Sequence, residues 1–243
     1  MREAEASAPA RALHPRPRVH VVSQYIPATT GLISGIGVFA LLAGLVHLRL
    51  LAAFDLAVAQ AMRSLWSPLF DAPAAATSIL LSGEFSLLYT LAGCVLLWRA
   101  GCGWWSLTPL AFLPLLALEL GLKLVVNQPL TPEEFHRAVS YPLATLTLHG
   151  SFPSGHATRS GFFCAYLAQL LRARGGRLAR LAPPTLMCLA VLLGMTRAYL
   201  GVHWVSDVLG GLLLGVSAGL LVAAPPARRL QQACFSSGKT TAG

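Results

Sequence analysis

The chain has 243 residues, of which 55% are hydrophobic and only 11% are charged, and its formal net charge is +9. A water-soluble domain carries far more charge, so this composition predicts an integral membrane protein. The basic residues lie between apolar runs and no nucleic-acid-binding motif is present, which excludes nucleic acid as a partner.

The two ends of the chain differ in composition from the rest. Residues 1–28 are rich in Ala, Pro and Arg and lack the apolar core of a secretory signal peptide. We expect a disordered cytoplasmic tail there, and a second cytoplasmic tail at residues 225–243. Residues 29–224 then form the membrane domain.

Apolar runs long enough to cross a bilayer recur along this domain, since a spanning helix needs about 20 apolar residues. Residues 51–71 are different, because charged residues alternate there with apolar ones at helical spacing, which is typical of an amphipathic helix in the membrane interface. We therefore expect an all-α fold, an integral membrane six-helix bundle with one interfacial amphipathic helix. The six expected spans are approximately residues 31–48, 72–98, 104–126, 154–171, 184–200 and 203–224.

The distribution of basic residues predicts the orientation. Of the 18 Lys and Arg residues, twelve fall on the side of the membrane that holds both termini, and six fall on the other. Because cytoplasmic loops carry the excess of Lys and Arg, both termini should be cytoplasmic. The polar loop of residues 127–152 should then face outward from the cell membrane.

Candidate catalytic residues gather in three segments on that outward side. Charged groups close to a bilayer are costly unless they pair or have a function. We expect the three segments to meet in one anion-binding pocket. Lys123 ends the third span, Ser154, Gly155 and His156 open the fourth, and Arg197, His203 and Asp207 flank the turn between the fifth and sixth.

Four of these residues suit phosphate binding. Ser154 and Gly155 lie at a helix N-terminus, where free backbone N–H groups attract an anion. Glycine allows a phosphate oxygen to approach the backbone closely. Lys123 and Arg197 add positive charge, and a guanidinium can bind two oxygens at once.

The other three suit proton and phosphoryl transfer. His203 and Asp207 are four residues apart at the start of a helix, so they share one face. Asp207 can hold one ring nitrogen of His203 and leave the other to attack phosphorus. His156 is the remaining titratable group and can protonate the departing oxygen.

In these segments the chain resembles the type 2 phosphatidic acid phosphatase superfamily, which includes the vanadium haloperoxidases. The family's Pro-Ser-Gly-His motif matches residues 153–156. Its motif of Ser-Arg, five residues, His, three residues and Asp matches TRAYLGVHWVSD at 196–207, with threonine in the serine position. The resemblance covers roughly residues 72–224.

The resemblance implies an acid phosphatase/vanadium haloperoxidase-like core over those residues. It also implies a phosphohistidine at His203 oriented by Asp207, with His156 as general acid and no metal or other cofactor. Lys123, Ser154, Gly155 and Arg197 would hold the phosphate oxygens.

The first motif departs from the family pattern, which has an arginine followed by proline seven residues after its lysine. Here Leu130 occupies that position. Arg137 is the only Lys or Arg in the loop after Lys123, and we take it as a candidate replacement in phosphate binding.

The expected function is a lipid phosphate or diphosphate phosphatase acting on the extracytoplasmic face. Undecaprenyl diphosphate, phosphatidylglycerophosphate and phosphatidate present the same anion, so the motifs do not choose among them. Two alternatives are a lipid-linked phosphotransferase that uses the same phosphohistidine and a non-catalytic lipid-binding membrane protein. The motifs give no oligomeric state.

Overall fold

The computed structural model describes residues 26–137 and 150–237. All regular structure in these two ranges is helical, which confirms the expected all-α class. The helices in chain order are α1 (Ile26–His47), α2 (Ala52–Ser64), α3 (Pro68–Leu80), α4 (Gly83–Arg99), η2 (Gly103–Ala111), α5 (Phe112–Val125), η3 (Glu133–Phe135), α6 (Gly155–Ala173), α7 (Gly176–Tyr199) and α8 (Val205–Ser237).

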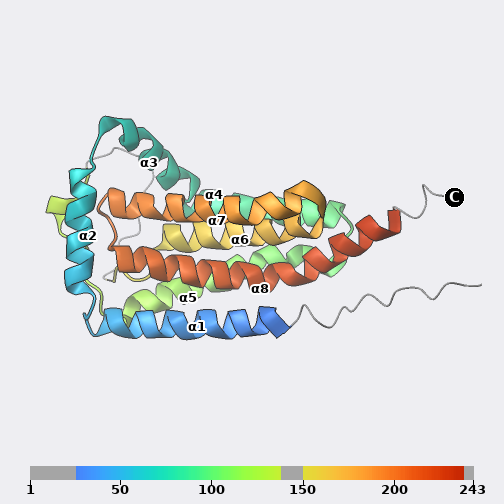
Figure 1. Ribbon diagram of the computed structural model, residues 1–243, viewed down its shortest axis with the longest axis horizontal. Helices are drawn as coiled ribbons and strands as arrows, with labels where there is room; N and C mark the ends of the chain where they lie inside the picture. Colours follow the sequence, from blue (N-terminus) through green and yellow to red (C-terminus); the bar gives the residue numbers. More distant parts are fainter. Residues whose placement is uncertain (1–25, 138–149, 238–243) are drawn as a thin grey trace, which may run out of the picture.

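Three long helices, α6, α7 and α8, run side by side through the centre of the molecule (Figure 1). Helix α6 is the innermost of them, because it packs against both of the others and buries most residues of its first half. Its N-terminal turn therefore has a rigid position, set by two neighbours.

Glycines on α8 bring its backbone against that of α6. A Cβ on Gly211 would lie 2.4 Å from the carbonyl oxygen of Ser154, and a Cβ on Gly215 would lie 2.1 Å from that of Thr158. One turn further, a Cβ on Gly219 would lie 2.5 Å from the Phe162 carbonyl oxygen. Spaced four residues apart, the glycines form the small-residue stripe that lets membrane helices approach closely. This contact fixes the first turns of α6 and α8 relative to each other.

Helix α2 crosses one end of the bundle (Figure 1), at 91° to α1. It occupies most of the segment expected to form an interfacial amphipathic helix. The next helix, α3, begins where the side chain of Ser67 accepts a hydrogen bond from the Leu69 N–H and Pro68 occupies the first helical position. A serine cap followed by proline is a common helix start.

The second expected span is not a single helix. Helices α3 and α4 meet at 58° around Leu81 and Ser82, and the Ser82 side chain accepts a hydrogen bond from the N–H of Phe85 to cap α4. The expected span over 72–98 carries an interruption in its sequence at Ser82-Gly83-Glu84, and the helix bends at that point. The sequence Ser82-Gly83 supplies a cap in the middle of an apolar run, which restarts the helix in a new direction.

Several helices are long and apolar enough to cross a membrane. Residues 103–125, 176–199 and 205–232 qualify alone, and up to five spans result if each bent pair, α1 with α2 and α3 with α4, is one span. Helix α6 is more polar, and it is enclosed by α7 and α8 instead of lining the outside. The expected count of six spans remains a prediction.

Large apolar side chains cover the outside of the bundle. Trp104 is 85% exposed, Leu124 74% and Leu192 66%. Exposed apolar surface on this scale indicates contact with lipid.

The C-terminal boundary differs from the expected one. Helix α8 continues through Pro225 and Pro226 to Ser237, so residues 225–237 are helical where a disordered tail was expected. The first helix begins at Ile26, close to the expected boundary at residue 29. The remainder of both expected tails, and residues 138–149 of the outward loop, lie outside the described residues.

Candidate active site

The three predicted segments converge at the end of the bundle that α2 crosses (Figure 1). Helices α5 and α7 end there, and α6 and α8 begin there. The backbone N–H of Ser154 donates to the carbonyl oxygen of Asp207 at 2.9 Å, which joins the start of α6 to the start of α8.

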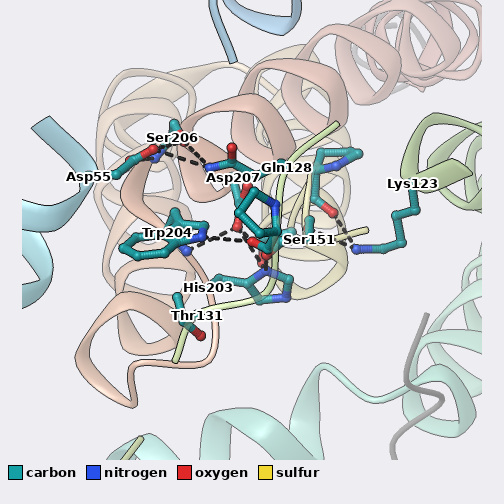
Figure 2. Close-up of polar contacts among 12 residues, drawn as sticks. Asp55, Lys123, Gln128, Thr131, Ser151, His203, Trp204, Ser206 and Asp207 are labelled. Carbon is teal, nitrogen blue, oxygen red and sulfur yellow. Dashed lines mark hydrogen bonds and ion pairs between the residues drawn. The ribbon is translucent and has the colours of Figure 1, made fainter. Parts of the chain in front are cut away.

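Asp207 is fully buried and organises the start of α8 (Figure 2). Its Oδ2 accepts from the backbone N–H of Trp204 at 2.9 Å, as an acidic residue in the first turn of a helix does when it caps that helix. The same oxygen lies 3.3 Å from Nδ1 of His203. Asp207 therefore holds the Nδ1 side of the His203 ring, as the four-residue spacing predicted.

Ser151 is a third member of this group. Its Oγ donates to Oδ2 of Asp207 at 2.5 Å and lies 3.2 Å from Nδ1 of His203. The sequence analysis did not assign Ser151, because it stands in the loop two residues before the recognised motif and has no spacing relation to His203.

Lys123 holds the loop that carries Ser151. Its Nζ donates to the carbonyl oxygens of Ser151 at 3.0 Å and Pro153 at 2.7 Å (Figure 2). The loop comes this close because residue 150 is glycine: a Cβ there would lie 1.9 Å from the Lys123 carbonyl oxygen. An ammonium has three donors. Two are directed at the backbone of the predicted phosphate-binding segment.

His156 and Arg197 meet at Ser78 of α3. Nε2 of His156 lies 3.1 Å from the Ser78 carbonyl oxygen, and Nη1 of Arg197 donates to Ser78 Oγ at 2.6 Å. A carbonyl oxygen only accepts, so Nε2 carries the proton in this contact. Ser78 was not assigned from the sequence, since nothing marks one serine of an apolar run as a neighbour of distant motifs.

Two buried oxygen atoms at the starts of α6 and α8 have no hydrogen-bond partner among the described residues. They are Oγ of Ser154 and Oδ1 of Asp207. Ser154 is the residue before the first turn of α6, and its side chain makes no capping bond. A hydroxyl left unpaired at a helix N-terminus suits an anion, because the hydroxyl and the backbone N–H groups donate to the same place.

Positive charge surrounds His203. Burial lowers the pKa of His203 well below its usual value of 6.5, and the charges of Lys123, Arg197 and Arg159 lower it further. His156 lies on the first turn of the helix whose N-terminus is joined to the start of α8, and the charge of His203 acts on it. A depressed pKa keeps His203 neutral, with a lone pair for attack on phosphorus.

Asp55 of α2 supports the site from the side. It is buried, and its carboxylate accepts from the backbone N–H of Ser206 at 2.9 Å and from Ser206 Oγ at 2.7 Å. The side-chain amide of Gln128 donates to the same carboxylate at 3.2 Å. Figure 2 shows Asp55 and Ser206 beside Asp207.

Arg137 is engaged outside this cluster. Its Nε and Nη2 donate to the two carboxylate oxygens of Asp71 at 3.1 and 2.7 Å, and its guanidinium lies over the ring of Trp66. Arg137 would therefore have to give up its bidentate contact with Asp71 before it could bind phosphate as predicted.

Residues that could hold a metal ion do not gather in the described part of the chain, where no group of three or more His, Cys, Asp or Glu side chains has suitable geometry.

Comparison with known proteins agrees with the motifs. Residues 103–230, more than half of the chain, match the PAP2 superfamily. The chain belongs to the PAP2 superfamily. The resemblance expected from the Pro-Ser-Gly-His and Arg-His-Asp motifs is thereby confirmed, and the relatives below are bacterial.

Curated PAP2 relatives match shorter segments. The chain is 38% identical over 96 residues to a lipid A 1-phosphatase of Rhizobium johnstonii, covering 38% of this chain and 36% of the relative. It is 35% identical over 118 residues to a putative undecaprenyl-diphosphatase of Escherichia coli, covering 46% and 56%. A phosphatidylglycerophosphatase B of Bacillus subtilis is 39% identical over 75 residues, covering 30% and 37%. The matched segments thus span about a third to just over half of these relatives.

A solved PAP2 structure has the same fold over most of the chain. The crystal structure of a transmembrane PAP2-type phosphatidylglycerolphosphate phosphatase from Bacillus subtilis superposes with a TM-score of 0.67 at 26% identity. The match covers 79% of this chain and 94% of that one. Together with the apolar helices, this makes the chain a multi-pass membrane protein of the PAP2 superfamily.

Proposed function

We propose that this protein is a membrane phosphatase that removes a phosphate from a lipid through a phosphohistidine at His203. The observation that carries the proposal is the arrangement of His203 and Asp207. Nδ1 of His203 lies 3.3 Å from a buried carboxylate, within a ring of positive charge. An imidazole held in this way is an activated nucleophile beside an anion-binding site.

In the first chemical step, Nε2 of His203 attacks phosphorus and forms an N–P bond while the P–O bond to the leaving group breaks. Arg197, Ser154 and the N–H groups at the start of α6 stabilise the charge on the phosphoryl oxygens. Lys123 holds the segment that presents those N–H groups, and its positive charge acts on His203.

His156 enters this step as the imidazolium, with a proton on each ring nitrogen, and supplies the proton that the leaving oxygen takes. Because Nε2 of His156 faces the Ser78 carbonyl oxygen, Nδ1 is the nitrogen that delivers the proton. In the second step the neutral His156 takes a proton from water, which attacks phosphorus and breaks the N–P bond. Free phosphate leaves and His203 is regenerated, with no metal required.

The substrate we propose is a phosphate monoester or diphosphate on a lipid whose tail remains in the bilayer. The names of the relatives support this class, since they describe phosphatases of lipid A, undecaprenyl diphosphate and phosphatidylglycerophosphate. Phosphatidate also belongs to the class. All of these present a terminal phosphate to the same pocket.

We also propose a topology. Six spans are formed by α1, the α3–α4 pair, η2 with α5, α6, α7 and α8, while α2 lies in the outer interface. Helix α1 starts and α8 ends at the end of the bundle opposite the site (Figure 1). The excess of Lys and Arg at that end supports a topology with both termini in the cytoplasm and the site outside. The catalytic core comprises residues 72–224.

The test is phosphate release from a panel of lipid phosphates in detergent, with and without EDTA. The panel contains undecaprenyl diphosphate, phosphatidylglycerophosphate, phosphatidate and lipid A. We expect release from at least one lipid, unchanged by EDTA and abolished in His203→Ala, while that variant remains folded in the membrane. Release that His203→Ala retains would contradict the proposed nucleophile, and release that EDTA abolishes would contradict metal independence.

A further inference from the structure

We propose that Arg159 supplies the phosphate-binding guanidinium that the first motif of this chain lacks at Leu130. This inference rests on the proposed function, because it concerns a contact made by the same phosphate. It assigns a substrate-binding role to a residue outside the three motifs.

Arg159 lies beside the helix N-terminus that is expected to receive the phosphate. It is one turn beyond Gly155 on α6, and its side chain folds back along that turn. A Cβ on Gly155 would lie only 2.7 Å from Nη1 of Arg159. The guanidinium therefore occupies space that only glycine leaves open, next to the backbone of the first turn.

The charge of Arg159 acts on three titratable groups of the pocket, which are His203, His156 and Lys123. Coulombic interaction falls off with distance, so these effects agree with the position of the guanidinium beside the first turn of α6.

The guanidinium has unused hydrogen-bonding capacity. The Arg159 side chain is only 12% exposed, and its buried Nε has no partner among the residues that the structure describes. The ion pair that it forms with Glu119 has an Nη2–Oε2 distance of 4.0 Å, which is too long for a hydrogen bond. Buried donors are rarely left unpaired, and a phosphate oxygen would satisfy this one.

Glu119 acts through Arg159 as a positioning residue. It is 3% exposed on α5, and a Cβ on Gly155 would lie 2.3 Å from its Oε1. The carboxylate thus lies on the same side of the first α6 turn as the guanidinium. A buried arginine needs an opposite charge, and this pairing holds Arg159 at the pocket while leaving Nε without a partner.

Arg137, the other candidate replacement, is already satisfied. Both oxygens of Asp71 accept from it, and Trp66 covers its face. A bidentate guanidinium would have to leave a good partner before it could bind phosphate. Of the two arginines, Arg159 is therefore the one with an unused N–H donor for a phosphate oxygen.

The experiment measures inhibition by orthovanadate, a phosphate mimic, in the full chain purified in detergent. The variants are Arg159→Gln, Arg159→Lys and Arg137→Gln, with Arg63→Gln as the matched control. Arg63 is an exposed arginine on α2 at the same end of the bundle. We expect Arg159→Gln to weaken vanadate inhibition and raise KM by about tenfold to a hundredfold, the loss of one charge-assisted contact. Arg159→Lys should weaken vanadate inhibition less than Arg159→Gln does. Arg63→Gln should keep both the vanadate inhibition constant and KM within about twofold of the wild-type values.

A rescue variant separates a binding role from a structural one. Leu130→Arg places a guanidinium where the family pattern has it, and Leu130 is half exposed, so the longer side chain has room. When it is combined with Arg159→Gln, Leu130→Arg should tighten the vanadate inhibition constant again by about tenfold or more. A merely structural role would change the yield of folded protein but not the inhibition constant of the folded fraction.

The outcomes are distinguishable. Wild-type vanadate inhibition in Arg159→Gln overturns the inference and leaves the proposed function standing. A loss in Arg137→Gln with none in Arg159→Gln overturns it in favour of Arg137. If Arg159→Gln does not fold, Arg159→Lys decides: weaker vanadate inhibition than wild type supports the guanidinium contact, and wild-type inhibition in that variant overturns it. A wild-type chain that releases no phosphate and does not bind vanadate contradicts both proposals.

Discussion

One oxygen atom of Asp207, Oδ2, contacts three groups of the site: a serine hydroxyl, a backbone N–H and the ring of His203. Oδ2 receives the Trp204 N–H and the Ser151 hydroxyl and faces Nδ1 of His203, while Oδ1 has no partner in the described residues. The carboxylate thus fixes the ring through Nδ1, and Nε2 is the nitrogen to which the proposed mechanism assigns the attack on phosphorus. This is the orienting role of an acidic residue beside a catalytic histidine.

The protonation of His203 should follow from this setting. Burial and the nearby cations disfavour the imidazolium, so the ring should stay neutral as the pH falls through 6.5 and take up its proton only below that value. Activity should accordingly survive to a lower pH than an ordinary histidine would allow. The measurement is an NMR titration of labelled histidine, with the His203 resonance assigned by its loss in His203→Gln. A midpoint at or above 6.5 would contradict the described electrostatics.

The key residues of the site were predictable where spacing carries information. His203 and Asp207 are four apart at a helix start, and Pro-Ser-Gly-His opens a helix, so both patterns specify geometry. Ser151, Ser78 and Arg159 carry no such signal. Their positions depend on how α3, α6 and the loop pack together, which a single sequence does not encode locally.

Among the helices, the contact between α6 and α8 controls the site. Gly215→Ala should force the two backbones apart, because its Cβ would meet the Thr158 carbonyl oxygen at 2.1 Å. We expect a loss of about 1–3 kcal/mol in stability, the usual result of overpacking, and a fall in activity. Thermal unfolding in detergent measures the first and phosphate release the second.

Gly44→Ala is the matched control for this contact. Gly44 is also a helical glycine, but a Cβ there meets nothing within 4 Å. Alanine favours a helix over glycine by about 1 kcal/mol, so this variant should be neutral or slightly more stable. Equal behaviour of the two variants would show that the glycine stripe is not a close contact.

Helix α2 should act on catalysis through Asp55. Asp55→Ala removes the acceptor for the Ser206 N–H, the Ser206 hydroxyl and the Gln128 amide, each of which is buried. An unsatisfied buried group costs about 1–3 kcal/mol, so we expect lower stability and a reduced kcat from a displaced start of α8. Asp55→Asn keeps one acceptor oxygen, so its stability and kcat should fall less than those of Asp55→Ala. A wild-type kcat in Asp55→Ala would contradict a role of α2 in catalysis.

The sequence identified α2 as amphipathic but assigned its polar face to the membrane interface. Asp55 instead points into the protein and binds the start of α8. Hydrophobic periodicity shows that a helix has a polar face, but not whether water or a protein partner satisfies it. The interruption at Ser82-Gly83-Glu84 was visible in the sequence, but the 58° change of direction between α3 and α4 was not, because it depends on how the two helices pack.

For the whole molecule, the arrangement of helix ends predicts membrane sidedness. Glu134 lies in the loop at the site's end, and Arg174 lies in the turn between α6 and α7 at the opposite end; both are exposed. In a chain without its native cysteines, Glu134→Cys should react in intact cells with a membrane-impermeant maleimide. Arg174→Cys should react only after the cells are opened. The reverse pattern would place the site in the cytoplasm.

The central claim is that phosphate passes through His203, and the most direct measurement is to trap it there. Wild-type protein is mixed with a lipid phosphate that it hydrolyses, denatured in base within one turnover, and digested for mass spectrometry. Phosphate should be attached to the peptide that contains His203 and absent from the His203→Ala protein. Phosphate on another residue, or product formed in a single turnover with no phosphorylated His203, would contradict the account.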